Sequence, residues 1–381
     1  MRTREWMGIA LALAFASATA SAQVKIGVIS SATGPTAVVG IPQKNTAALL
    51  PRKIGDLGVE YVVLDDASDP TQTVIGVKKL LAENIDALIG PSGSPNAVGV
   101  VPLMAEAATP MLAPVGTISV VLPMDDKKRW VFKTTQNDQL ICDAIVEHMK
   151  KNGVKTVGFI GFNDPYGDNW HTVFGEEAQK AGIKVVASER YMRSDSSVTG
   201  QVAKLMAAKP DAVLVAAAGG PTVLPQITLF DAGYKGHVYQ THGAAAPDFL
   251  RLGGPKVEGT VLAASLMLVL PEIPDSVASK KVAQEYIASY EKAYGSKPAT
   301  FGANVYDAGL LLTRAIPEAA KKAKPGTREF RAALRDALEG TKELVGTQGV
   351  YNMTPADHSG FDERGRVLIT VKNGTWRLLG D

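Results

Sequence analysis

A chain of 381 residues is too long for one ordinary hydrophobic core, so two domains are expected. Hydrophobic residues make up 46% of the sequence and charged residues 20%, a globular composition that excludes an extensively disordered chain. The formal net charge of +2 is too small to indicate nucleic acid or an acidic membrane surface as a partner.

Residues 1–22 have the pattern of a secretory signal peptide. Two arginines precede an apolar stretch from Met7 to Ala20, and Ala20-Ser21-Ala22 is a cleavage signal. A membrane anchor is the alternative, but the apolar stretch is too short to span a bilayer comfortably. The only cysteine is Cys142, so there is neither a disulfide partner nor a lipid-anchor cysteine at the cleavage point. We therefore expect a secreted, soluble periplasmic protein.

Short apolar strands then alternate with helix-length segments. The predicted strands are Lys25–Ile29, Glu60–Leu64, Ala87–Ile89 and Met111–Ala113, and the helices between them cover about residues 41–54, 71–83 and 95–107. This alternation is typical of βαβ units and predicts a parallel sheet.

The same alternation restarts after Trp130. A helix over Asp138–Lys151 precedes strands at Thr156–Ile160, Lys184–Ser188, Ala212–Ala216 and His237–Tyr239, with helices at about residues 169–181, 197–208 and 222–232. The fold class predicted is therefore α/β, with two doubly wound, Rossmann-like lobes of similar build.

The last hundred residues predict helices and a hairpin rather than a third domain. The helices cover residues 280–294, 304–323 and 328–338, and the hairpin strands are Val367–Val371 and Trp376–Leu379, joined at Asn373-Gly374. Completing both lobes requires three crossovers, which we expect near residues 134–139, 263–270 and 344–349. The predicted N-terminal lobe is 23–136 plus 268–346, and the C-terminal lobe is 137–267 plus 347–381.

Two neighbouring predicted strands end in small, uncharged residues, at Gly90–Ser94 and at Pro114–Thr117. Ligands of open parallel sheets bind beyond the carboxyl ends of the strands. Glycines allow close approach, Ser94 and Thr117 offer hydroxyls, and a helix start at Ser94 favours an anion. We expect a carboxylate held by neutral donors; ordinary strand–helix turns are the alternative. A phosphate loop is not indicated, because its motif does not occur.

A secreted serine hydrolase is a distant alternative. The sequence GPSGS at Gly90–Ser94 resembles a nucleophile elbow but ends in serine, and His242 could approach the same cleft. No HExxH motif or cysteine-rich metal site occurs, so no metal is expected.

Three further segments of the second predicted lobe lie at strand ends. Tyr166 opens a helix and offers a ring and a hydroxyl, Gly219 and Gly220 allow close approach, and His242 follows a strand. For each, a purely structural turn or loop role is the alternative.

Taken in order, several segments resemble the periplasmic solute-binding proteins of branched-chain amino acid type that feed ABC transporters. They are VKIGVISSATGPTAVVG, VLDDASDPTQTV, IDALIGPSGS, ATPMLAP, FNDPYGDNW, DAGY, FGANVYDAG and TPADHSGFDERGRVLITVKNGTW. The resemblance covers about residues 24–381. It implies the type I periplasmic-binding fold, whose two lobes close on a ligand about three hinge crossovers. It also implies no catalysis, no cofactor, and a permease and ATPase as partners.

The resemblance also implies site residues. In the family's amino-acid binders the first lobe holds the ligand carboxylate at positions that match Ser94, Val115, Gly116 and Thr117, and a second-lobe tyrosine matches Tyr166. Those binders hold the ammonium with an acidic residue, where this sequence has His242, and we expect no acid nearer than Asp248. A buried ammonium without a partner costs several kcal/mol. We therefore expect an aromatic or 2-oxo acid, such as benzoylformate or phenylpyruvate, with a branched-chain or other amino acid as the alternative.

Overall fold

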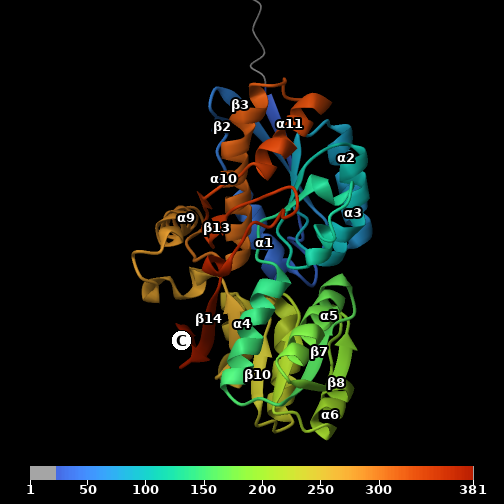
Figure 1. Cartoon of the computed structure of the whole chain (residues 1–381), viewed down its shortest axis with the longest axis vertical. Helices are drawn as coiled ribbons and strands as arrows, with labels where there is room; N and C mark the ends of the chain where they lie inside the picture. Colours follow the sequence, from blue (N-terminus) through green and yellow to red (C-terminus); the bar gives the residue numbers. More distant parts are fainter. Residues whose placement is uncertain (1–22, 381) are drawn as a thin grey trace, which may run out of the picture.

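The structure, a computed structural model, describes residues 23–380. Its two lobes are stacked along the long axis, with the first sheet in the upper lobe and the second in the lower lobe (Figure 1). The signal peptide predicted for residues 1–22 lies outside the described residues. No helix in the described part of the chain is long and apolar enough to cross a membrane.

The first lobe contains a six-stranded sheet in the order β2-β3-β1-β4-β5-β6, parallel except for the β2–β3 pair. Its strands are β1 (Gln23–Ser30), β2 (Lys53–Ile54), β3 (Leu57–Asp65), β4 (Ala87–Ile89), β5 (Met111–Ala113) and β6 (Val131–Lys133). One face packs on α2 (Pro70–Ala82) and α3 (Ser94–Glu106), and the other on α1 (Ala37–Ala47), α10 (Thr300–Ala320) and α11 (Arg328–Glu339). Because both faces are covered, the inner strands β4 and β5 consist of buried apolar residues only.

The second lobe contains a seven-stranded sheet in the order β15-β14-β11-β10-β9-β7-β8, with β14 and β15 antiparallel. Its strands are β7 (Thr156–Phe162), β8 (Lys184–Tyr191), β9 (Ala212–Ala216), β10 (His237–Gln240), β11 (Val261–Ala264), β14 (Val367–Lys372) and β15 (Thr375–Leu378). Its helices are α4 (Asp138–Lys151), α5 (Pro165–Lys180), α6 (Thr199–Ala207), α7 (Val223–Asp231) and α8 (Pro247–Gly253). The predicted α/β class with two lobes is confirmed.

Two features of the sheets differ from the prediction. The helix expected over residues 41–54 is wrong: α1 ends at Ala47, and the chain forms the β2–β3 hairpin, where Gly55 has a positive φ of 59°. The strands β6 and β11 were not predicted, because each lies beside a crossover, where the alternation of strands and helices is interrupted.

The third crossover lies later than predicted. The chain crosses first between β6 and α4, and again between β11 and α9 (Ala278–Tyr294). It then forms the small β12 (Leu344–Val345) and β13 (Val350–Tyr351) pair. Tyr351 and Met353 belong to the core of the first lobe, and the His358 carbonyl accepts a hydrogen bond from the Lys133 N–H. The boundary expected at 346/347 therefore moves to between Phe361 and β14.

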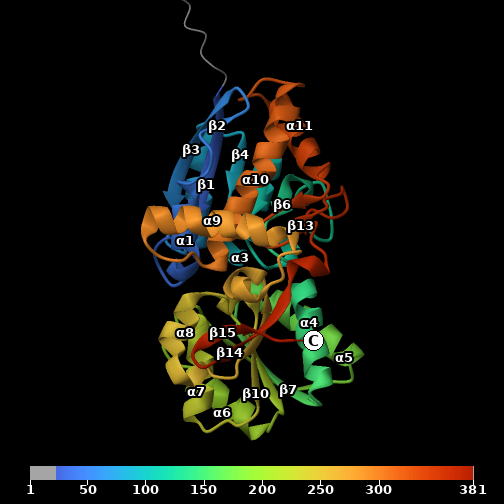
Figure 2. The ribbon, with the colours of Figure 1, turned by 90° about the vertical axis from the view of Figure 1, so that its left-hand side faces the viewer.

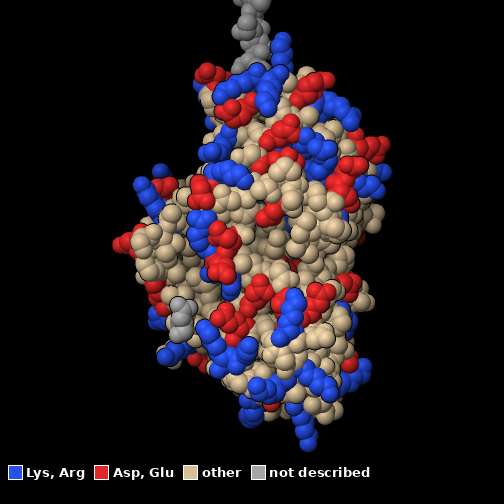
Figure 3. Space-filling view, viewed as in Figure 1, with Lys and Arg blue, Asp and Glu red and all other residues tan. Residues whose placement is uncertain are grey.

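Figure 2 shows how the late segments complete both lobes: α10 and α11 lie in the upper lobe, and the β14–β15 hairpin lies in the lower one. Charged side chains of both signs are interspersed over the face drawn in Figure 3, in keeping with the small net charge. The molecule therefore presents no large surface of one sign on that face.

Candidate functional site

A small cavity lies between the two lobes, where strand ends of both sheets meet. Its first-lobe lining is Thr36, Val39, Ser92, Gly93, Ser94, Pro114, Val115, Gly116, Thr135, Phe301 and Asn304; its second-lobe lining is Tyr166, Arg193, Ala218, His242 and Gly243. Its volume is about 40 Å³, far below the several hundred Å³ of a typical ligand pocket, so the lobes lie closely against each other.

The first lobe offers neutral donors to this cavity. Ser94 is the first residue of α3, is 4% exposed, and its hydroxyl makes no hydrogen bond to the described residues. Asn304, on α10, uses its Oδ1 as an acceptor for Gln348, which leaves its amide N–H groups for another partner. A helix start with a free hydroxyl is suited to an anion.

Gly116 lies where the two lobes are in close contact. A Cβ at this position would lie 2.7 Å from Asp138 Oδ1, 2.9 Å from His242 Nε2 and 2.9 Å from Tyr166 Cε2. All three neighbours belong to the second lobe, so only glycine leaves room for this degree of closure.

The second lobe contributes two ring side chains predicted from the sequence. Tyr166, near the start of α5, is buried and donates to the Thr241 hydroxyl at 2.8 Å. His242, just after β10, is 8% exposed, and its Nδ1 is buried without a partner among the described residues. Burial and the nearby Lys133 ammonium lower the pKa of His242 to about 3, so its imidazole is neutral.

A buried carboxylate, Asp138, and a buried ammonium, Lys133, adjoin the cavity, and Asp138 corrects the expectation that no acid lies nearer to His242 than Asp248. Asp138, the first residue of α4, places Oδ1 3.9 Å from His242 Nε2 and accepts a hydrogen bond from Asn169 at 2.5 Å. Burial raises the pKa of Asp138 and lowers that of Lys133, while their opposite charges counteract both shifts. The Lys133 ammonium donates to the Gly116 and Gln136 carbonyls.

The lining includes five of the eight residues expected from the sequence and not the other three. Ser94, Val115, Gly116, Tyr166 and His242 line the cavity. Thr117 is buried beside it and bonds to Ser119 at 2.8 Å, whereas Gly219 and Gly220 lie at the rim, against Val38 and Val39 of α1. Contact of any of the eight residues with a ligand stays a prediction.

Sequence reasoning missed Arg193, Asn304 and Asp138. Arg193 lies in the polar loop after β8, and Asn304 lies on a helix that follows the second lobe in the sequence. Asp138 was read as an ordinary helix start; an acidic residue at the exit of a crossover was the available signal. None of the three stands near a strand end that the sequence marked as part of the site.

The described residues do not bring Ser92 or Ser94 together with His242 as a catalytic serine–histidine pair. Ser92 donates to Gln43 Oε1 at 2.5 Å and accepts from the Ser31 N–H, and neither Ser92 nor Ser94 is hydrogen-bonded to His242. Among residues 23–380, no group of three or more histidine, cysteine, aspartate or glutamate side chains is placed to hold a metal ion.

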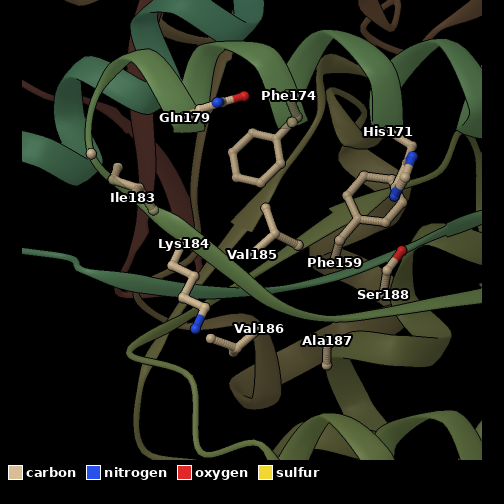
Figure 4. A pocket seen from close by; sticks show the side chains of 12 residues that line it. Phe159, His171, Phe174, Gln179, Ile183, Lys184, Val185, Val186, Ala187 and Ser188 are labelled. Atoms are coloured by element: carbon tan, nitrogen blue, oxygen red, sulfur yellow. The ribbon is translucent and has the colours of Figure 1, made fainter.

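Larger hollows occur away from the strand ends. One of about 710 Å³ lies between α5 and the edge strand β8, lined by Phe159, His171, Phe174 and Val185 among others (Figure 4). Another, of about 800 Å³, lies at the back of the hinge between α4, α9 and β14. Neither is placed where parallel sheets bind ligands, so the inter-lobe cavity is the candidate site.

Comparisons with known proteins agree with this geometry. Residues 23–373 match the model of a family described as periplasmic binding protein. A Leu/Ile/Val-binding protein homolog 3 of Brucella melitensis is 26% identical over 329 residues, which are 84% of each chain. The crystal structure of an extracellular ligand-binding receptor from Rhodopseudomonas palustris HaA2 has a TM-score of 0.92 at 44% identity and covers 94% of this chain and 100% of its own.

A third relative shares the fold alone. It is the solute binding protein of an ABC transporter from Rhodopseudomonas palustris BisB5, in complex with 3,4-dihydroxy benzoic acid, with a TM-score of 0.77 at 20% identity over 93% of this chain and 95% of its own. Taken with the two lobes and the cavity at their facing strand ends, the match over residues 23–373 means that the chain belongs to the periplasmic binding protein family.

Proposed function

We propose that this protein is an extracytoplasmic solute-binding protein that captures a small carboxylate, favouring aromatic or 2-oxo acids such as benzoylformate or phenylpyruvate. It delivers the ligand to the permease and ATPase of an ABC importer, after export to the periplasm directed by residues 1–22. The protein binds and releases its ligand without catalysis.

The observation that carries this proposal is the cavity lined from both lobes. A ligand there contacts both sheets at once, so it stabilises the closed form over the open form by the sum of those contacts. An aromatic acid exceeds the present volume of about 40 Å³, so the lobes must open to admit it, and the lining side chains must move outward as the lobes close on it. A membrane permease distinguishes the closed, ligand-bound form of the two lobes from the open form.

The electrostatics of the cavity favour an acid without an amine. His242 is neutral, so a ring N–H can donate to a keto or hydroxyl oxygen. Asp138 is not part of the lining, and the buried Lys133 nearby balances its charge. The cation that does line the cavity, Arg193, repels an ammonium.

A branched-chain amino acid is the second candidate. The names of the curated relatives support it, and so does Asp138, whose Oδ1 is buried without a hydrogen-bond partner among the described residues. An ammonium that reached Asp138 would gain a charged partner there.

A thermal-shift screen of matched pairs tests the proposal. Phenylpyruvate is compared with phenylalanine, 4-methyl-2-oxopentanoate with leucine, and benzoylformate with phenylglycine. A bound ligand raises Tm by mass action, and we expect the oxo acid of each pair to give the larger rise. Stabilisation by leucine but not by its oxo acid would favour the second candidate, and no shift with any small acid or amino acid would contradict the function itself.

A further inference from the structure

Arg193 lines the same small cavity as Ser94, from the opposite lobe. The space open to the centre of a water molecule is only about 40 Å³, a few times the ~10–15 Å³ that one buried water requires. Side chains that line so small a space are within reach of a single functional group placed in it.

The orientation of the guanidinium is fixed before any ligand arrives. Arg193 Nε donates to Asp164 Oδ2 at 2.6 Å, and its Cζ lies 4.3 Å from the centroid of the Phe162 ring. Asp164 is itself held by the N–H groups of Tyr166 and Gly167 at the start of α5. The Arg193 side chain is 15% exposed, so little conformational freedom remains to be lost on binding.

This arrangement leaves the outer nitrogens of the guanidinium for a ligand. Asp164 engages only Nε, and neither Nη1 nor Nη2 has an acceptor among the described residues. Arginine stays protonated at any physiological pH, and its paired N–H groups match the two oxygens of a carboxylate.

We infer that the ligand carboxylate lies between the Ser94 hydroxyl of the first lobe and the Arg193 guanidinium of the second. This inference rests on the proposed function and deepens it: the anion is held by one neutral and one charged donor, and the charged contact spans the cleft. Recognition of the carboxylate and closure of the lobes are then one event, and an uncharged analogue of the same shape is rejected.

Isothermal titration with benzoylformate and its uncharged amide, benzoylformamide, tests the inference. The wild-type protein should bind the acid far more tightly than the amide. Arg193→Gln should weaken acid binding by about 10- to 100-fold, the range for hydrogen bonds to a charged group, and leave amide binding unchanged. Arg193→Lys, which keeps the charge, should restore part of the loss.

Arg190→Gln is the matched control. Arg190 lies three residues away, donates to the Gly167 carbonyl at 2.7 Å and does not line the cavity, so its loss should not alter the preference for the acid. Equal wild-type affinity for acid and amide, or unchanged discrimination in Arg193→Gln, would overturn the inference while the binding function stands. Failure of the wild-type protein to bind any small acid or amino acid would instead contradict the proposed function.

Discussion

Gly116 is a residue at which the two lobes are in close contact. A methyl group there would meet Asp138, His242 and Tyr166 at 2.7–2.9 Å, closer than real Cβ contacts. The neighbours are a buried carboxylate and two packed rings, none of which can move away freely.

Gly116→Ala should therefore oppose closure without unfolding either lobe. Overpacking of 1–3 kcal/mol in the closed form corresponds to a loss of affinity of about tenfold or more, measurable by titration calorimetry. Gly99→Ala is the control, because a Cβ at Gly99 on α3 would meet nothing within 4 Å. Equal affinities for the two variants would show that the ligand-bound form lacks the close contacts made at Gly116 in this structure.

His242 gives the stability of the protein a pH dependence of defined sign. Burial and Lys133 lower its pKa from 6.5 to about 3 in the folded state. Between these values the unfolded chain binds a proton that the native state does not, so the contribution of His242 to stability is lost as pH falls below about 6.5.

Urea unfolding of the wild-type protein and of His242→Gln at pH 7 and pH 5 measures this effect. Over the 1.5 units from pH 6.5 to pH 5, the wild-type protein should lose about 2 kcal/mol relative to the variant, at ~1.36 kcal/mol per unit. Asp138 titrates in both proteins, so its own raised pKa largely cancels in the comparison. A constant difference across this pH range would mean that His242 is protonated in the native state.

At the scale of elements, the helix α5 carries both Tyr166, which lines the cavity, and Trp170, whose indole is buried. Tyr166 and Trp170 lie one turn apart on this helix, and the Trp170 ring centroid is 6.1 Å from that of His242. Ligand binding and lobe movement change the surroundings of both rings.

Ligand addition should therefore change the tryptophan emission, and the change should come from Trp170. Fluorescence titration of the wild-type protein and of Trp170→Phe checks this. Trp170 packs on Tyr166 and His242 of the lining, whereas Trp130 packs on Arg335 and Trp376 on Phe249. A signal that persists in Trp170→Phe would assign the change to another element.

The elements of the parallel sheets were predictable because strands covered on both faces are continuous apolar runs, as in Ala212–Ala216. The helix over residues 41–54 was not, because nothing in an apolar pattern distinguishes its last turn from the hairpin strand β2. Ser94 and His242 were predictable from the ends of the predicted strands, because the direction of parallel strands determines which edge of the sheet binds ligands. Arg193 and Asp138 reach the site through loop and crossover geometry, which a local pattern does not encode.

For the whole molecule, the two lobes meet at the cleft rim as well as inside it. A Cβ at Gly219 would lie 3.9 Å from the Cβ of Val38 in the opposite lobe, within the 3.5–4.5 Å range that suits a disulfide. Cysteines at these positions would join the lobes only in the closed form.

The variant Val38→Cys/Gly219→Cys should cross-link faster when ligand is present, because ligand increases the closed population. Non-reducing electrophoresis over time measures the rate, with each single cysteine variant as a control; Cys142 is buried and should not compete. The backbone of Gly219, with φ 70° and ψ −149°, costs about 1–3 kcal/mol with a side chain, which lowers the yield but not the ligand dependence. Equal rates with and without ligand would argue against ligand-driven closure.

The three crossovers have a consequence for how the polypeptide acquires its shape. One face of the first sheet is covered by α10 and α11, which are synthesised only after most of the second lobe. The second sheet is complete only when β14 and β15, the last strands in the sequence, have been synthesised. Partly made chains must therefore keep large apolar faces from associating with one another until the final residues emerge, because contacts this distant in sequence form slowly. Neither lobe is built from one continuous stretch of the chain, so a nascent chain should need protection from aggregation along almost its entire length.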